Sequence, residues 1–103
     1  MDTQDRYAQG QTQEAMDAAM EIFAQFAGLV GISPDDPAAL AVAKRWQEHI
    51  NMYYYECPDE VFAVVGQFYP TDKDFVEFTD GFAPGTAQFM CDVIAAYCAA
   101  NKQ

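Results

Sequence analysis

The chain has 103 residues, of which 51% are hydrophobic and 15% aromatic, and this content predicts one folded domain with a single core. Sixteen acidic residues against five basic ones give a formal net charge of −11, so the chain alone is not expected to bind nucleic acid or an anionic membrane surface. No apolar run approaches the roughly 20 residues of a membrane span, and the N-terminus lacks the basic and apolar parts of a secretion signal. We therefore expect a cytoplasmic protein, with residues 1–11 as a flexible N-terminus.

Residues 12–30 carry apolar side chains at the spacing of an amphipathic helix. One apolar face comprises Met16, Met20, Phe23, Ala27 and Val30, and a second comprises Ala19, Ile22, Phe26 and Leu29. Gly31 follows as a helix terminator. The spacing therefore predicts a helix that buries both faces against two neighbours.

The second helix is predicted to start with Asp36 as its N-cap and Pro37 at its first position, and to run to about Tyr55. Pro58 disfavours helical geometry at the residue before it and so ends the helix. The spacing predicts buried side chains at Leu40, Ala43, Trp46, Ile50 and Tyr53 or Tyr54. His49 has polar neighbours in the sequence and is expected at the surface.

Residues 58–69 form the third predicted helix. Its apolar residues cover most of the circumference, which favours a central position in the fold. Pro70 ends it, and a short helix follows up to Gly81. Thr71 is the expected N-cap of this short helix, and Phe75 and Phe78 are expected to face inward.

The last helix is predicted to begin near Pro84 and to run through Asn101. Its expected buried residues are Phe89 or Met90, Val93, Ile94 and Tyr97. The sequence thus predicts a single all-α domain of about five helices, without strands or internal repeats.

The residues with metal or nucleophile chemistry do not form a recognisable site. Cys91 and Cys98 lie two helical turns apart, too far to share a zinc ion without other ligands, and the acidic residues lack calcium-loop spacing, so no metal or cofactor is expected. Three cysteines are an odd number without a disulfide framework, so reduced thiols are expected. On one helix, His49 and Cys57 would lie about 12 Å apart along the axis, beyond the reach of a nucleophile and its base. We therefore do not expect an enzyme.

Cys57 lies where the third helix starts, and this position has two interpretations. A helix N-terminus stabilises a thiolate and lowers its pKa. The carboxylates of Glu56, Asp59 and Glu60 are close in sequence and oppose a negative charge. A reactive thiol and a small hinge residue both remain open.

Eight phenylalanines, six tyrosines and a tryptophan provide more aromatic surface than a domain of this size needs for its core. Successive helical side chains are rotated by about 100°, so Tyr53, Tyr54 and Tyr55 sweep roughly 200° and cannot all face one core. At least one must line a cleft or meet solvent. An apolar, aromatic-lined cleft for a large hydrophobic ligand would use this surface.

Three segments resemble a known family. They are "YYEC" at 54–57, "GQFYPTDKDF" at 66–75 and "GTAQFMCDVIAAY" at 85–97, and their order and spacing are similar to those of the TipAS-type antibiotic-recognition domain. That domain forms the C-terminal part of certain MerR-family transcription activators. The resemblance implies an all-α, globin-like fold with a hydrophobic cleft for large multicyclic antibiotics such as thiopeptides. It also implies that Cys57, at the position of the family's recurrent cysteine, attacks a dehydroalanine of the bound thiopeptide.

The resemblance and the helix pattern together give the candidate ligand-binding residues, which are Trp46, Ile50, Tyr53, Tyr54, Tyr55, Cys57, Phe62, Tyr69, Phe75 and Phe89. Two positions depart from the family pattern. Trp46 stands where many members have a histidine eleven residues before the cysteine, and Pro58 stands where they have Ser, Thr or Asp after it. A larger indole and a stiffer turn would change which antibiotic fits.

The main prediction is that residues 1–103 form a module that binds a bulky hydrophobic small molecule of the antibiotic type. It would act as the effector domain of a regulator with a DNA-binding domain in cis, or as a free-standing protein that sequesters the drug. The alternative is a helical protein-interaction domain whose cleft receives an amphipathic partner helix. Capture of a protein, rather than tight binding of a small molecule, would favour the alternative.

Overall fold

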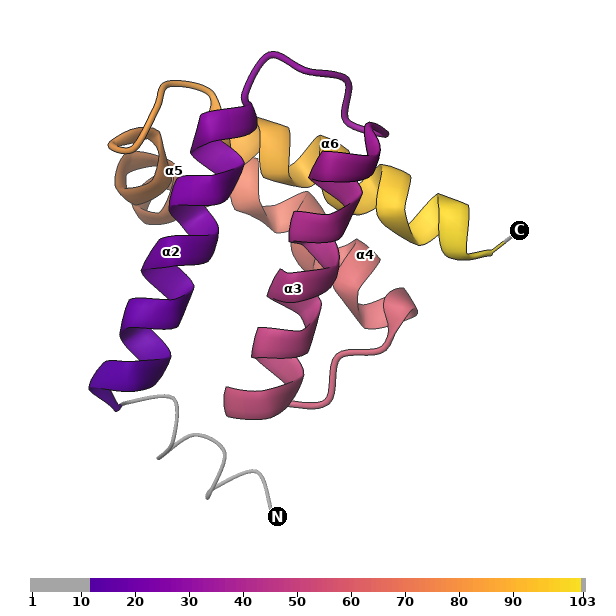
Figure 1. Cartoon of the computed structure of the whole chain (residues 1–103), viewed down its shortest axis with the longest axis horizontal. Helices are drawn as coiled ribbons and strands as arrows, with labels where there is room; N and C mark the ends of the chain where they lie inside the picture. The colour runs from indigo at the N-terminus through magenta and orange to yellow at the C-terminus, as the bar shows by residue number, and fades with distance from the viewer. Residues whose placement is uncertain (1–11, 103) are drawn as a thin grey trace.

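The computed structural model describes residues 12–102, which form five α-helices and one 3₁₀ turn (Figure 1). They are α2 (Gln13–Leu29), α3 (Pro37–Tyr53), α4 (Asp59–Phe68), η1 (Tyr69–Thr71), α5 (Lys73–Asp80) and α6 (Thr86–Asn101). No strand occurs among the described residues. The predicted all-α fold of five helices is confirmed, whereas the predicted flexible N-terminus, residues 1–11, lies outside the described residues.

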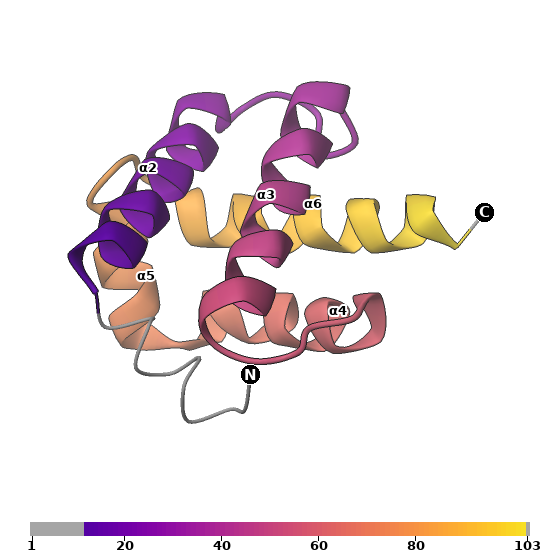
Figure 2. The ribbon, with the colours of Figure 1, turned by 60° about the horizontal axis from the view of Figure 1, so that its bottom comes forward.

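The helices form two layers. α2 and α3 lie side by side, and α4 and α6 run across them on one side, with α5 near one end (Figures 1 and 2). α6 packs against α2, α3, α4 and α5, and it buries Thr86, Ala87, Phe89, Met90, Val93, Ile94 and Cys98. α6 is therefore the central helix of the fold. No helix within residues 12–102 is long and apolar enough to cross a membrane.

The predicted start of the second helix is confirmed, and the helix ends at Tyr53, two residues before the predicted end near Tyr55. Asp36 caps α3, since its carboxylate accepts a hydrogen bond of 2.9 Å from the backbone N–H of Ala38, and Pro37 follows at the start of the helix. Gly31, just after α2, has a φ of 106°, a left-handed conformation that glycine adopts without strain. These residues set the loop that brings α3 back alongside α2.

The predicted cap of the short helix is wrong by one residue. Asp72, not Thr71, caps α5, and its carboxylate accepts a 3.1 Å hydrogen bond from the N–H of Phe75. Thr71 belongs to η1, where its hydroxyl donates to the carbonyl of Phe68 at 2.8 Å. Because the 3₁₀ turn extends to Thr71, the cap position falls on Asp72.

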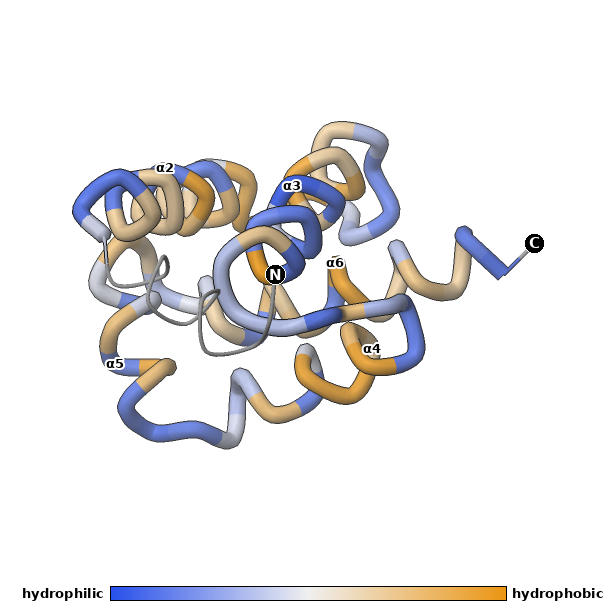
Figure 3. Tube along the Cα trace, turned by 90° about the horizontal axis from the view of Figure 1, so that it is seen from below, coloured by the Kyte–Doolittle hydropathy of each residue, from blue (hydrophilic) through white to orange (hydrophobic). Residues whose placement is uncertain are grey.

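The prediction that the third helix is central is also wrong. Only Phe62 and Gly66 of α4 are buried, whereas Val61, Val64 and Phe68 are exposed. α4 contacts mainly α6 and η1 and so buries one face, although its sequence is hydrophobic over most of its length (Figure 3). Apolar residues on all sides of a helix therefore do not show whether the helix is central, because an outer helix can also expose apolar side chains.

Of the two apolar faces predicted for the first helix, the second forms the core contact. Ala19, Ile22 and Phe26 of that face are buried, whereas of the first face Met16 and Met20 are 52% and 42% exposed. Phe23 is the only buried side chain of the first face. The two methionines line a surface hollow instead of the core, and this hollow is described below.

Candidate functional site

Nine aromatic rings from α2, α3 and its C-cap, η1, α5 and the loop after α5 form a connected network of contacts, which we name the aromatic cluster. Its members are Phe23, Trp46, His49, Tyr53, Tyr54, Tyr69, Phe75, Phe78 and Phe82. Five of the predicted ligand-binding residues, Trp46, Tyr53, Tyr54, Tyr69 and Phe75, are thus brought together. Aromatic surface of this extent can hold a large apolar ligand.

Phe23 lies at the centre of the aromatic cluster. Its ring centroid is 4.8 Å from that of Trp46 on α3, and 5.9 Å and 5.8 Å from those of Phe75 and Phe78 on α5. The pairs with Phe75 and Phe78 are edge-to-face, a favourable geometry for aromatic rings. One side chain therefore connects α2 to both α3 and α5.

A hydrogen bond fixes the far side of the aromatic cluster. The indole N–H of Trp46 donates to the hydroxyl of Tyr69 at 3.0 Å, and Tyr69 stacks on Phe75 with 4.3 Å between ring centroids. Burial raises the pKa of the Tyr69 hydroxyl far above its usual value of 10, although the bond from Trp46 acts in the opposite direction. The hydroxyl is therefore neutral at physiological pH.

A hollow of about 440 Å³ opens beside Phe23, and we name it the α2 groove. It is lined by Gln13, Met16, Asp17, Ala19, Met20, Phe23, Tyr54 and Phe78. Met16, Met20 and Phe78 are exposed to solvent at its edge, although Phe78 was predicted to face inward. The α2 groove is the most apolar concavity that touches the aromatic cluster.

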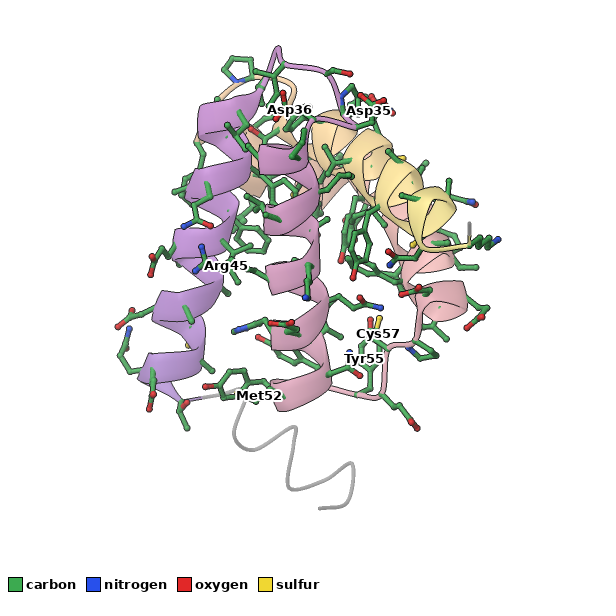
Figure 4. All side chains as sticks on the ribbon, turned by 45° about the vertical axis from the view of Figure 1, so that its right-hand side comes forward. Asp35, Asp36, Arg45, Met52, Tyr55 and Cys57 are labelled. Atoms are coloured by element: carbon green, nitrogen blue, oxygen red, sulfur yellow. The ribbon has the colours of Figure 1, made fainter. Side chains whose placement is uncertain are left out.

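A second hollow, of about 250 Å³, lies between α2 and α3. Its lining residues are Ala18, Ile22, Arg45, Glu48, His49, Met52 and Tyr53. Arg45 extends from α3 toward α2, where its guanidinium donates to the side-chain carbonyl of Gln25, and Met52 lies at the end of α3 (Figure 4). Tyr53 lines this hollow and Tyr54 lines the α2 groove, so successive tyrosines face different hollows, as expected from the helical rotation.

A third hollow, of about 690 Å³, is larger than these two and lies elsewhere. It runs along η1 and α5 and is lined by Pro70, Thr71, Lys73, Val76, Glu77, Asp80 and Gly81. None of the residues predicted to bind ligand lines it, and three of its seven lining residues are charged. Its chemistry does not suit an apolar multicyclic ligand, so the α2 groove is the candidate site.

The remaining predicted residues lie outside the aromatic cluster. Ile50 and Phe89 are buried in the core, and Phe62 packs edge-to-face on Tyr97 of α6 at 5.9 Å. Tyr55 is exposed in the loop after α3, close to Cys57 (Figure 4). None of these four residues lines the two hollows beside α2.

Cys57 is completely buried in the loop between α3 and α4. The side chain of Asn51 holds the loop through two bonds to the backbone of Cys57, accepting from its N–H at 2.7 Å and donating to its carbonyl at 3.2 Å. Gln47 donates to the same carbonyl at 3.0 Å. Burial raises the pKa of the Cys57 thiol to about 11, and the nearby Cys98 and Asp59 add to this effect.

The model of one protein family, the TipAS antibiotic-recognition domain, matches residues 1–97. The chain belongs to the TipAS family. The nosiheptide complex of TipAS, from a thiopeptide antibiotic multidrug resistance system of Streptomyces lividans, superposes on this TipAS domain with a TM-score of 0.81 and 27% sequence identity, over 96% of this chain and 78% of that chain. The antibiotic-binding domain of a TipA-class multidrug resistance transcriptional regulator gives a TM-score of 0.76 and 28% identity, over 89% of this chain and 100% of that chain.

A longer protein is also similar to this TipAS domain. The HTH-type transcriptional activator mta of Bacillus subtilis (strain 168) is 30% identical over 77 residues, which are 75% of this chain and 30% of that protein. The chain thus spans less than a third of the length of this relative. The resemblance deduced from the sequence motifs is confirmed, and so is the globin-like, all-α fold.

His49 is a member of the aromatic cluster of this TipAS domain whose place was predicted wrongly from the sequence. It was predicted at the surface, but it is 6% exposed and its ring stacks on Trp46 with 5.4 Å between centroids. The signal was present, because His49 lies three residues after Trp46 and four before Tyr53, on the same helix face. Within residues 12–102, no group of three or more His, Cys, Asp or Glu side chains is placed to hold a metal ion.

Proposed function

We propose that this domain binds a large, apolar, multicyclic antibiotic of the thiopeptide class in the α2 groove. The observation that carries the proposal is the edge of the groove, where Met16, Met20 and Phe78 are exposed around a floor that includes Phe23 and Tyr54. Exposed apolar side chains gathered around a hollow are typical of ligand sites. Methionine side chains also adapt to irregular ligand shapes.

Similarity to proteins that bind such compounds supports the proposal. The neighbour from Streptomyces lividans is a complex with nosiheptide, and 96% of this chain superposes on it. We assign Trp46, Tyr53, Tyr54, Tyr69 and Phe75 to the aromatic surface under the ligand. Ile50, Phe62 and Phe89 support this surface from the core, and Tyr55 and Cys57 lie at its margin.

Residues 1–103 act, in this proposal, as one effector domain of a MerR-type transcription regulator in the cytoplasm. The similarity to an HTH-type transcriptional activator, of whose length the chain covers 30%, supports this role. In this proposal, DNA binding belongs to another part of the longer protein. Binding of the antibiotic would shift the regulator toward its active state by mass action. The domain recognises its ligand and does not transform it as an enzyme would.

Thermal unfolding in the presence of nosiheptide tests the proposal. A ligand at about 100 times its Kd stabilises a protein by about 2.7 kcal/mol, so we expect a clear rise in Tm. Replacing Met16 and Met20 together with serine should reduce this rise. Val64→Ser is the matched control, because Val64 is about as exposed as the methionines but lies on α4, away from the groove.

Two results would contradict the proposal. The first is a Tm that does not change with nosiheptide or with other thiopeptides. The second is an equal loss of the Tm rise in the methionine variant and in Val64→Ser, because the α2 groove would then not be the site. Intact mass measured with and without Cys57→Ser would show whether the bound antibiotic is attached covalently.

A further inference from the structure

His49 has a polar atom that the fold does not use. The side chain is 94% buried, and its Nε2 has no hydrogen-bond partner among the described residues. Buried polar side-chain atoms are bonded in the large majority of cases, and one that is not bonded reduces stability. An orphaned nitrogen of this kind needs an explanation beyond packing.

The ring of His49 lies within the aromatic cluster. It is nearly parallel to the indole of Trp46, with 13° between the ring planes, and its centroid is 4.8 Å from Tyr53 and 5.7 Å from Tyr54. His49 and Tyr53 line the second hollow, while Tyr54 lines the α2 groove. The imidazole therefore lines the second hollow and contacts a wall residue of the α2 groove.

Packing alone would be better served by an apolar ring at position 49. A phenylalanine would keep the stacking on Trp46 and the contacts with Tyr53 and Tyr54, and it would bury no unpaired nitrogen. Burial lowers the pKa of His49, so the imidazole is neutral at pH 7. A neutral imidazole nitrogen can donate or accept one hydrogen bond without needing a charged ligand.

We propose that His49 is the polar anchor of the ligand site, where its Nε2 forms a hydrogen bond with an amide or hydroxyl group of an otherwise apolar ligand. This inference rests on the proposed antibiotic-binding function. Because Nε2 is sealed from solvent, the side chains packed around the imidazole must move before a ligand reaches this atom. The site thus selects ligands that carry a hydrogen-bonding group on an apolar framework over pure hydrocarbons.

Three variants of His49 test the proposal, with nosiheptide as the probe. In His49→Phe we expect a higher Tm without ligand, because the orphaned nitrogen is gone, together with at least a tenfold weaker affinity for nosiheptide. His49→Gln keeps an amide near the position of Nε2 and should retain affinity within about threefold. His49→Asn is the matched control, because its shorter amide does not reach that position and should bind as weakly as His49→Phe.

The outcomes separate this inference from the proposed function. If the unmodified chain fails to bind nosiheptide and other thiopeptides, the proposed function falls, and this inference falls with it. If the unmodified chain binds but His49→Phe binds equally well, only the anchor role is wrong. A lower Tm in His49→Phe would likewise show that His49 has a structural role instead.

A measurement on the unmodified chain avoids any folding defect of the variants. His49 is the only histidine, so histidine labelled with ¹⁵N gives a single imidazole spectrum. On addition of nosiheptide we expect the Nε2 resonance to shift more than the Nδ1 resonance. Equal or absent shifts, in a chain that is saturated with nosiheptide, would overturn the proposal.

Discussion

Replacing Gly66 with alanine should destabilise the domain, although alanine is the better helix former. Gly66 lies on α4 where that helix meets α6, and a Cβ at this position would lie 2.8 Å from Cγ2 and 3.1 Å from Cβ of Ile94. Both distances are shorter than the roughly 3.5–4.0 Å of an ordinary carbon–carbon contact. Because Ile94 is completely buried, the added methyl group must push the two helices apart.

The sign of the effect follows from two opposing contributions. Alanine gains about 1 kcal/mol over glycine in helix propensity. Overpacking of a core contact costs about 1–3 kcal/mol, and the very short distances place Gly66→Ala in the upper half of that range. We therefore expect a net loss of about 1–2 kcal/mol, which corresponds to a Tm lower by roughly 4–16 °C in a domain of this size.

Gly28→Ala is the matched control, measured by the same thermal and urea unfolding. Gly28 is also helical, in the last turn of α2, but a Cβ at this position would have no heavy atom within 4 Å. The propensity gain is then unopposed, and stability should rise by about 0.5–1 kcal/mol. If both variants become more stable, the close packing of α4 on α6 is wrong.

Three further predictions concern the site. Tyr69→Phe removes the acceptor for the indole N–H of Trp46 and should cost about 1–3 kcal/mol in urea unfolding, whereas an unchanged midpoint would mean that water replaces the hydroxyl. Asn51→Ala removes two hydrogen bonds to the backbone of Cys57 and should therefore speed alkylation of this thiol. Peptide mass analysis measures the alkylation rate, and an unchanged rate would show that burial alone protects the thiol. Burial lowers the pKa of His49, so the imidazole binds a proton more tightly in the unfolded chain than in the folded one. The free energy of unfolding should therefore fall as the pH drops below about 6.5, and it should fall less in His49→Phe.

Local signals predicted the helices well because they act through neighbouring residues. Asp36 and Pro37 start α3 whatever packs against it, and Gly31 ends the α2 segment through its own backbone conformation. The layer order could not be predicted in this way, since an apolar surface on α4 has the same sequence pattern whether α6 or solvent faces it. Gly66 was the missed clue, because a glycine within an apolar helix often marks the close approach of another backbone.

The candidate site was predicted in composition but not in arrangement. His49 lies three residues after Trp46 and four before Tyr53, so the contacts that join Trp46 to Tyr53 through His49 follow from helical spacing. The contribution of Phe23, which joins them to α5, depends on how α2 packs against α5, and no local pattern contains that information. For the same reason Met16 and Met20 fitted a core stripe in the sequence but line the groove in the fold.

Cys57 shows how burial outweighs a local electrostatic effect. Its place just before α4 favours a thiolate, but helix-terminus effects on charged groups are worth only about 0.3–1 kcal/mol near the surface. The completely buried thiol instead has a pKa of about 11, so at pH 7 only about one molecule in 10⁴ carries the reactive thiolate. Covalent attachment at Cys57 stays a prediction, and it requires the loop held by Asn51 to open first. An adduct with nosiheptide would therefore report opening of this loop, whereas reversible binding in the α2 groove would proceed with the loop closed.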